Sequence, residues 1–446
     1  MGKMVNTYQS TAADGQHFVR RARNILRISR FIVAIVAASF VTAAAIANGQ
    51  DTTPPASPTG LIATASIAAI SLDWDDNAES DLAGYKVERS TTASGPWTLL
   101  NSLLLSTSAY NDGTAQPGVT SYYRVVAVDQ SVNPSAPAST SAARLFTTIT
   151  WKSATAAPLK RAEGFGGFAN GKLYLFGGYY GDAHFTPTQR ADAYDPATNM
   201  WTRIADLPIG LSHVGAAVDG ANFYFAGGYP TQAGGTGQTF STAAVWKYNT
   251  TTNTYAAMPS LPLARGGGAL VRDGRVLHYF GGSGPARKDT GTHWALNIDT
   301  GTAWTTRAPM PIAVNHLGSV LLNGKIYAVG GQSGQDAAAT IRNNVDAYDP
   351  TTNTWTAVAP LPLARSHHEA STFVMGERII VVGGKSAIGA RLASVTAYDP
   401  RTNTWTELTP LPVAKSAPVG DQVNGVLYVT TGNTVASTHK GVPVAP

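Results

Sequence analysis

The sequence predicts an all-β protein in which a small β-sandwich precedes a six-bladed β-propeller. The segment "DAYDPATNMWT" begins at Asp192 and returns with few changes at Asp346 and Thr396. The aromatic residues that end such segments recur about every 50 residues, a period typical of propeller blades. Charged residues make up only 13% of the chain, which has 45 Gly and 26 Pro. That composition favours short strands joined by tight turns.

Residues 1–47 are predicted to be a secretory signal peptide. A cluster of basic residues ending at Arg30 precedes the uncharged segment 31–47, which closes on Ala45-Ile46-Ala47. This order of basic region, apolar core and small-residue cleavage site indicates export to the bacterial envelope, either periplasmic or extracellular. A retained signal anchor is the alternative, because the apolar segment is at the lower limit for spanning a bilayer. Only an anchor would attach the protein to a membrane.

The charge distribution excludes nucleic acid as a partner. The formal net charge of +5 comes from residues 1–47, and the remaining chain has 26 basic and 26 acidic residues. The folded part therefore offers no basic excess for binding phosphates. The chain has no Cys, so it forms no disulfides and depends on its packed sheets for stability.

Residues 53–145 are predicted to form the sandwich. Apolar residues alternate with polar ones at 69–75, 84–90 and 121–129, which indicates three half-buried strands. About ninety residues with one buried Trp and no helical period are typical of a two-sheet sandwich. The segments "LDW", "GYKVERS" and "YYRVVAVD" resemble the fibronectin type III family. The resemblance implies a spacer or adhesive module.

Residues 146–446 are predicted to form six four-stranded units. Segments such as "NGKLYLFGG" start with Asn-Gly, the strongest signal for a two-residue hairpin, and end in a Gly pair. The repeated "DAYDPATNMWT" segment then supplies a second hairpin. Two hairpins make one blade, and six blades close into a ring. The Gly pairs lie at 177–178, 227–228, 281–282, 330–331 and 383–384, with a degenerate Thr431-Gly432.

The phase of the repeats predicts how the ring closes. The chain enters the repeats at Trp151, which is a fourth-strand mark, and the last unit lacks its own fourth strand. Residues 146–153 are therefore expected to complete that last blade. Closure of this kind removes the open sheet edges that invite aggregation.

These marks resemble the kelch repeat family in every unit of 146–446. The resemblance implies a monomeric binding or scaffold protein that recognises a protein or a glycan through one face of the propeller. The alternative that it leaves open is a carbohydrate-active kelch enzyme, such as the sialic acid mutarotases. A galactose oxidase is excluded, because its copper site requires a Cys.

One end of the predicted channel collects basic and imidazole side chains. The loop entering the first strand of each unit has a cation or an apolar residue at one position and often a His two residues later. A ring of such groups suits an anionic or sugar-like ligand; the alternative is that these side chains only bond strand ends. The predicted ligand-binding residues are Arg161, His213, Arg265, His316, Arg365, His367 and Lys415.

No catalytic residue, metal site or cofactor is predicted. The chain has no GxSxG or HExxH motif and no phosphate-binding loop, so we expect a non-enzymatic protein. A three-histidine metal site at His213, His316 and His367 is not expected, because units two and four should lie across a wide ring. In the mutarotase alternative, the recruited residues would be Arg161, Arg265, Arg365, Glu163 and Glu369.

Overall fold

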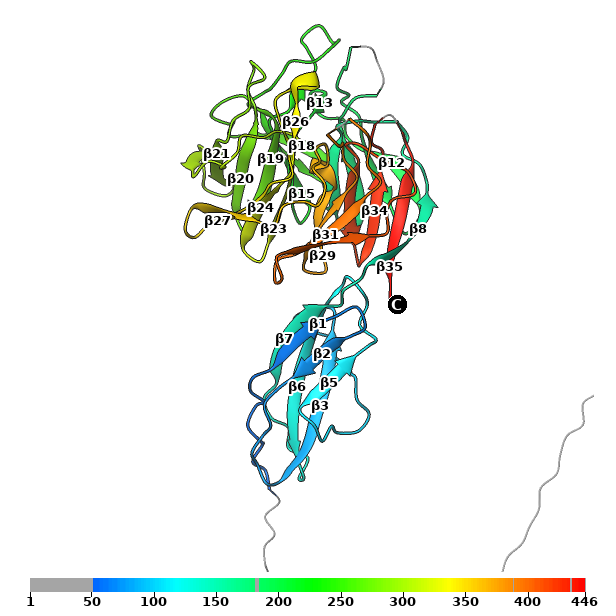
Figure 1. The fold of residues 1–446 in the computed structure, drawn as a ribbon, viewed down its shortest axis with the longest axis vertical. Helices are drawn as coiled ribbons and strands as arrows, with labels where there is room; N and C mark the ends of the chain where they lie inside the picture. The colour runs from blue at the N-terminus through cyan, green and yellow to red at the C-terminus, as the bar shows by residue number, and fades with distance from the viewer. Residues whose placement is uncertain (1–50, 181–183, 388, 434, 446) are drawn as a thin grey trace, which may run out of the picture. The chain divides into compact units, whose positions relative to one another are not determined.

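The computed structural model describes residues 51–180, 184–387, 389–433 and 435–445 (Figure 1). The predicted signal segment 1–47 lies outside these residues. Within the described ranges, no helix is long and apolar enough to cross a membrane.

Two antiparallel sheets form between residues 62 and 143 and bury the predicted apolar faces. Trp74, Tyr85 and Tyr123 lie in their shared core, with the Trp74 and Tyr85 ring centroids 5.2 Å apart. One sheet has the order β1 (Ile62–Ala65), β2 (Ile70–Asp73), β5 (Ala109–Asp112), and the other β4 (Thr98–Leu99), β3 (Leu82–Ser90), β6 (Thr120–Asp129), β7 (Ala138–Ala143).

The rest of the described chain contains six four-stranded antiparallel sheets. The first two are β9 (Phe165–Ala169), β10 (Lys172–Phe176), β11 (Ala191–Asp195), β12 (Met200–Arg203), and β14 (Gly215–Asp219), β15 (Asn222–Ala226), β17 (Val245–Asn249), β18 (Thr254–Met258). The next two are β19 (Gly266–Asp273), β20 (Val276–Ser283), β21 (His293–Asn297), β22 (Thr305–Arg307), and β23 (Gly318–Leu322), β24 (Lys325–Val329), β27 (Val345–Asp349), β28 (Thr354–Val358). The last two are β29 (Thr372–Met375), β30 (Arg378–Val382), β31 (Val395–Asp399), β32 (Thr404–Leu408), and β33 (Val419–Val423), β34 (Val426–Thr430), β35 (Thr438–Val444), β8 (Thr148–Ala154).

The Asn-Gly pairs make the two-residue hairpins between first and second strands. Asn323 and Gly324 have φ of 51° and 72°, and Asn424 and Gly425 have 51° and 75°. Positive φ at both turn positions matches the right-handed twist of the flanking strands, and Asn and Gly adopt it most readily.

The first strands of the sheets form a closed ring. β9 packs beside β14, and the contacts continue through β19, β23, β29 and β33 back to β9. The sixth sheet joins both ends of this part of the chain, because β35 pairs with β8 from Thr438 opposite Ala154 to Val444 opposite Thr148. The arrangement is a β-propeller, with the first strands innermost.

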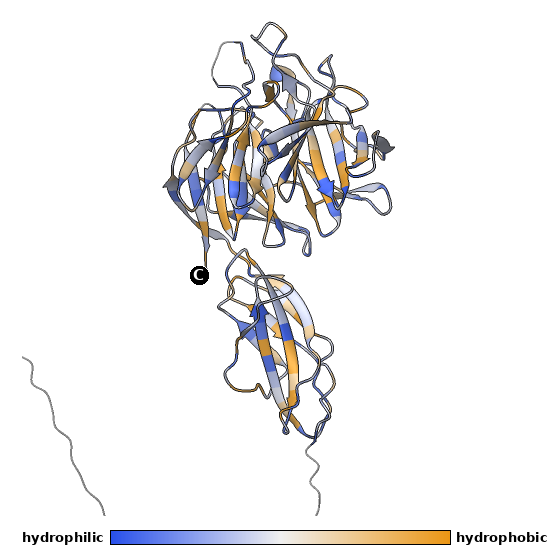
Figure 2. Cartoon of the chain, turned by 180° about the vertical axis from the view of Figure 1, so that it is seen from behind, coloured by the Kyte–Doolittle hydropathy of each residue, from blue (hydrophilic) through white to orange (hydrophobic). Residues whose placement is uncertain are grey.

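Apolar side chains fill the space between neighbouring sheets. Phe176 on β10 and Phe225 on β15 have ring centroids 4.8 Å apart, so aromatic rings join the first sheet to the second. Hydrophobic residues run along the strands of the sheets (Figure 2).

Two pairs of short strands lie in the loops at one end of the propeller, where β13 and β26 are labelled in Figure 1. β13 (Leu211–Ser212) pairs with β16 (Tyr229–Pro230), and β25 (Gln332–Ser333) pairs with β26 (Thr340–Ile341). Two 3-10 turns complete the described elements, η1 (Asp336–Ala338) and η2 (Glu369–Ser371).

The repeated segment ties four of the six described sheets to the sheet before them. Asn353, at φ 57°, accepts hydrogen bonds from the Tyr348 hydroxyl at 2.8 Å and from the Ala308 N–H at 2.9 Å. The Trp355 indole N–H donates to the Ala308 carbonyl at 2.9 Å. Both polar groups of one backbone residue in the connecting loop are thus bonded to the next sheet. Equivalent bonds join Asn199 and Trp201 to Thr155, Asn253 and Tyr255 to Ala205, and Asn403 and Trp405 to Ala359.

Replacing Asn353 tests this connection. Asn353→Leu loses the acceptor and strains the left-handed backbone, so it should lower the free energy of unfolding by about 2–3 kcal/mol in urea titrations. Asn353→Gly keeps the backbone conformation and should cost about 1–2 kcal/mol. Asn353→Asp keeps an acceptor oxygen and should cost least. Equal losses for the three variants would contradict the role of the side-chain oxygen.

Candidate functional site

Six residues line one mouth of the propeller channel, and we call them the mouth ring. Each lies just before or at the start of the first strand of one sheet. All six have φ between 50° and 68°, in the left-handed region. Backbone N–H groups donate around the ring: Gly267 to the His213 carbonyl at 2.8 Å, His316 to Gly267 at 2.8 Å, His367 to His316 at 3.2 Å. Non-glycine residues rarely adopt this conformation, and such strain concentrates at functional sites. The mouth ring consists of Glu163, His213, Gly267, His316, His367 and Ala417.

The three predicted histidines lie together in this ring. The ring centroids of His213 and His316 are 4.8 Å apart, and those of His316 and His367 are 4.2 Å apart. The expectation that units two and four hold their histidines too far apart is wrong. Gly267 lies between His213 and His316 in the ring, and it has no side chain to separate the two imidazoles.

A carboxylate completes the cluster. Glu163 Oε1 lies 3.6 Å from His367 Nε2, and Glu163 Oε2 lies 3.9 Å from His213 Nε2. Burial and the neighbouring carboxylate of Glu369 raise the pKa of Glu163. Burial lowers the pKa of His316 to about 3, with Lys385 and Arg287 contributing. The histidines are therefore neutral at physiological pH.

Each histidine is held at Nδ1 by the residue before it. Ser212 Oγ lies 2.9 Å from His213 Nδ1 and Ser366 Oγ 2.7 Å from His367 Nδ1, while the Asn315 amide oxygen contacts His316 Nδ1. The polar residue before His therefore fixes the orientation of the imidazole, which leaves Nε2 available.

A cavity of about 260 Å³ opens above the histidines. Its walls combine aromatic rings, amides and charged groups, a lining that suits a polar ligand with apolar faces. A second cavity of about 390 Å³ adjoins it and shares Tyr179, Phe185, His367 and Lys385. The first cavity is lined by Tyr179, Phe185, His213, Tyr229, Gln238, Phe240, Arg287, His316, Gln332, Gln335, Asp336, His367 and Lys385.

Sequence reasoning missed the cations of this cavity. Arg287 forms an ion pair with Asp336 at 2.6 Å, and its guanidinium lies 4.4 Å from the Phe240 ring centroid. Among the described residues, the Lys385 ammonium forms no ion pair. Lys385 directly follows the Gly pair 383–384, and Arg287 lies in the short loop after the pair 281–282. A cation soon after a Gly pair is therefore the sequence signal that could have identified both.

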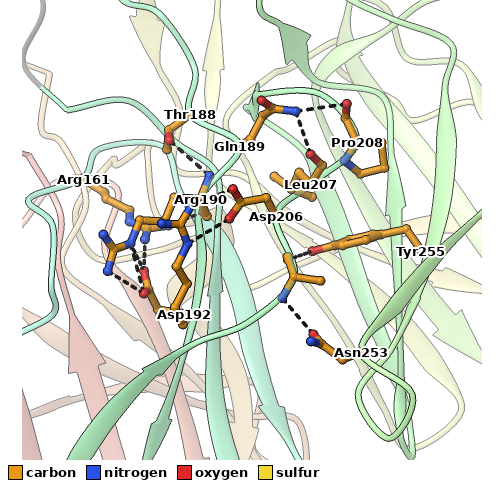
Figure 3. A network of polar contacts seen from close by, with 12 residues as sticks. Arg161, Thr188, Gln189, Arg190, Asp192, Asp206, Leu207, Pro208, Asn253 and Tyr255 are labelled. Atoms are coloured by element: carbon orange, nitrogen blue, oxygen red, sulfur yellow. Dashed lines mark hydrogen bonds and ion pairs between the residues drawn. The ribbon is translucent and has the colours of Figure 1, made fainter.

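The predicted cations Arg161, Arg265, Arg365 and Lys415 lie instead within the sheets. Arg161 is fully buried and forms an ion pair with Asp192, which Arg190 also contacts at 3.0 Å (Figure 3). Arg365 donates to the Gly383 carbonyl at 3.3 Å, and Arg265 to the Ala264 carbonyl at 2.8 Å.

Lys415 is bonded in the same way. Its ammonium donates to the Thr431 carbonyl at 2.7 Å and to the Ser437 carbonyl and hydroxyl, both at 2.9 Å. The structure thus divides the predicted ligand-binding set. The three histidines face the mouth, and the four cations bond backbone and side chains of their own sheets.

Two protein-family models match the propeller. The KLHDC2/KLHL20/DRC7 Kelch-repeats domain matches residues 212–432, and the Kelch motif matches residues 166–208. The chain carries kelch repeats. Kelch domains generally bind proteins.

Curated relatives with kelch repeats come from several kingdoms. The chain is 29% identical to Kelch-like protein terF of Aspergillus terreus over 50% of this chain and 49% of the relative. It is 28% identical to Kelch repeat-containing protein At3g27220 of Arabidopsis thaliana over 53% and 58%. Kelch-like protein 23 of Homo sapiens is 29% identical over 44% of this chain and 33% of the relative. The kelch part thus spans about half the length of the first two relatives.

One solved structure bears on the expected absence of catalysis. "Structure of YjhT" matches 66% of this chain and 96% of its own, with a TM-score of 0.49 and 15% identity. YjhT is a sialic acid mutarotase, so this comparison does not support the expectation of a non-enzymatic protein. The likeness concerns the fold, and no reaction is assigned to this chain from it.

Substituting two buried arginines separates their structural contributions. Arg161→Met leaves the fully buried Asp192 with only Arg190, so the free energy of unfolding should fall by about 3 kcal/mol. Among the described residues the Arg365 guanidinium makes one long hydrogen bond, so Arg365→Met should be neutral or stabilising. Thermal and urea unfolding measure both. A larger loss for Arg365→Met than for Arg161→Met would contradict these assignments.

Lys415 makes stability depend on pH. Burial lowers its pKa to about 8, whereas an unfolded chain has a Lys pKa of about 10.4. Between these values the unfolded state binds more protons, so this residue makes stability rise with pH. The free energy of unfolding of wild type relative to Lys415→Met should therefore increase by up to about 3 kcal/mol from pH 7.5 to 10.5. Lys160→Met, at an exposed lysine, is the control; a difference that stays constant with pH would contradict the prediction.

Proposed function

We propose that this protein is an exported binding module that recognises a glycan, in particular a sugar acid, in the cavity above the mouth ring. The observation that carries the proposal is the joint presence of aromatic rings, amides and Lys385 around about 260 Å³. That volume is slightly below the usual range of about 300–1,000 Å³ for small-molecule sites, so it suits a ligand as small as one sugar residue.

The aromatic walls supply the apolar contacts that a sugar ring needs. Tyr229 packs on His213 with ring centroids 4.2 Å apart, and Phe240 meets Tyr229 edge-on at 5.4 Å. Rings fixed by such contacts lose little conformational entropy when a ligand packs against them. Tyr180 lies in a separate cleft with Thr231.

The polar groups favour an acidic sugar over a neutral one. Lys385 has no competing ion pair among the described residues, so its ammonium is available to a carboxylate. Arg287 is oriented by Asp336, and Gln332 and Gln335 offer amide groups to hydroxyls.

The other parts of the chain fit a secreted module. We propose that residues 1–47 direct export, that 53–145 form a fibronectin type III-like spacer, and that 146–446 are a six-bladed propeller. The pairing of β8 with β35, the ring of innermost strands and the six four-stranded sheets support the last of these. The three-plus-four strand arrangement supports the second.

A glycan array followed by saturation-transfer NMR with free sialic acid tests the binding proposal. Wild type should bind acidic glycans, and Lys385→Met should weaken that binding about tenfold or more, because a charge-assisted hydrogen bond is lost. Lys325→Met is the matched control, since Lys325 follows an Asn-Gly turn at the start of β24, at the opposite end of that strand from the mouth. Binding that is unaffected by Lys385→Met, or found only for neutral glycans, contradicts the proposal.

The NMR experiment and a pull-down from envelope extract distinguish two alternatives. Accelerated exchange of the sialic acid anomers would indicate a mutarotase. Capture of an envelope protein without any glycan binding would instead indicate the protein-binding role that kelch domains generally have.

A further inference from the structure

We propose that Glu163, His316 and His367 bind a divalent transition metal ion of the zinc class at the floor of the mouth cavity, with His213 beside them as a further ligand. This inference goes beyond the proposed glycan binding and does not depend on it.

The geometry brings the ligand atoms within reach of one ion. One nitrogen of His316, one of His367 and a carboxylate oxygen of Glu163 all lie within 4.8 Å of one another. Two atoms bound to one zinc ion at about 2.0–2.1 Å lie about 3.4 Å apart at a tetrahedral angle. The distances of 3.6 Å from Glu163 to His367 and 3.9 Å to His213 are close to that spacing. Binding would require movements of less than about 1 Å.

The hydrogen bonds around His316 determine its tautomer. The Asn315 amide nitrogen donates to Asp289 at 2.7 Å and to the Gly334 carbonyl at 3.3 Å, so the Asn315 oxygen faces His316 Nδ1. An amide oxygen only accepts, so Nδ1 carries the proton and Nε2 presents a lone pair.

His367 is held in the same tautomer. Ser366 donates its hydroxyl proton to Gln332 Oε1 at 3.1 Å, and the Gln332 amide nitrogen donates to the Gly334 carbonyl at 3.3 Å. The Ser366 oxygen therefore accepts from His367 Nδ1, which leaves Nε2 unprotonated beside Glu163. Imidazoles fixed at one nitrogen by an outer hydrogen bond are the usual form of histidine in metal sites.

Within the described residues, Glu163 Oε2 has no hydrogen-bond partner although Glu163 is only 5% exposed. A buried carboxylate oxygen without a donor is costly. Around this one lie the imidazoles of His213 and His367 and the carboxyl group of Glu369. A cation satisfies this oxygen and the imidazole lone pairs at once. Imidazole and carboxylate ligands without sulfur suit zinc, iron, nickel or copper(II), and the imidazoles disfavour calcium and magnesium.

Zinc binding by the full chain, purified without a histidine tag and stripped with a chelator, tests the site. After one equivalent of ZnCl₂ and gel filtration, elemental analysis should find about one zinc per chain, and zinc should raise the melting temperature. X-ray absorption should show a nitrogen and oxygen shell that contains imidazole. Calorimetry should give an affinity that falls at least a hundredfold in His316→Ala and in Glu163→Gln, and about tenfold in Ser366→Ala, which only orients His367.

His184→Ala removes an exposed histidine outside the cluster and is the control, so its zinc affinity should equal that of wild type. Glu163→Gln is nearly isosteric, and it keeps the test valid if His316→Ala fails to fold. Wild type without stoichiometric zinc overturns the proposal, and so does unchanged zinc affinity in Glu163→Gln and His316→Ala. These measurements contain no sugar, so their failure is separate from failure of glycan binding.

Discussion

The left-handed backbone of the mouth ring is the constraint on which the channel end of the propeller depends. At each sheet entry the chain has to turn from the loop into the innermost strand, and it does so through one residue with φ near 55°. For Gly267, His316, His367 and Ala417, the N–H of that residue donates to the carbonyl of the mouth-ring residue of the preceding sheet. The histidine side chains of the ring meet one another and the mouth cavity. The same turn therefore joins the sheets and presents the functional groups.

This constraint explains why the mouth could be predicted in part. The positions of Glu163, His213, His316 and His367 follow from the repeat register, which the Gly pairs and Asn-Gly turns make readable. The distances between these side chains do not follow from the register. They depend on the width of the channel mouth, which the repeats do not specify. Sequence reasoning therefore identified the histidines but separated them too widely.

The cations were assigned to the wrong surroundings for a different reason. Arg161, Arg365 and Lys415 lie two residues before the mouth ring, and a two-residue shift normally keeps a side chain on the same face of a strand. The left-handed residue breaks that alternation, so the cations enter the sheets and bond carbonyls there. The cavity cations Arg287 and Lys385 come from loops of unequal length, for which the repeats offer no register. The strand pattern, in contrast, was readable throughout, because alternation and turn residues are local.

The bonds made by the repeated Asn and Trp residues bear on how such a chain can evolve. Four units reach back to the loop before them through an Asn and an aromatic residue such as Asn353 and Trp355, and the other two do so through Trp151 and Trp304. These units therefore carry the residues of their own attachment. A duplicated unit would already contain the residues that form these bonds, so its neighbour would need no new contact residues. The pairing of β8 with β35 lies within a single sheet, whereas the ring itself is closed by contacts between the first strands of neighbouring sheets. A ring with an added unit would therefore have to keep both the β8–β35 pair and an unbroken circle of first-strand contacts.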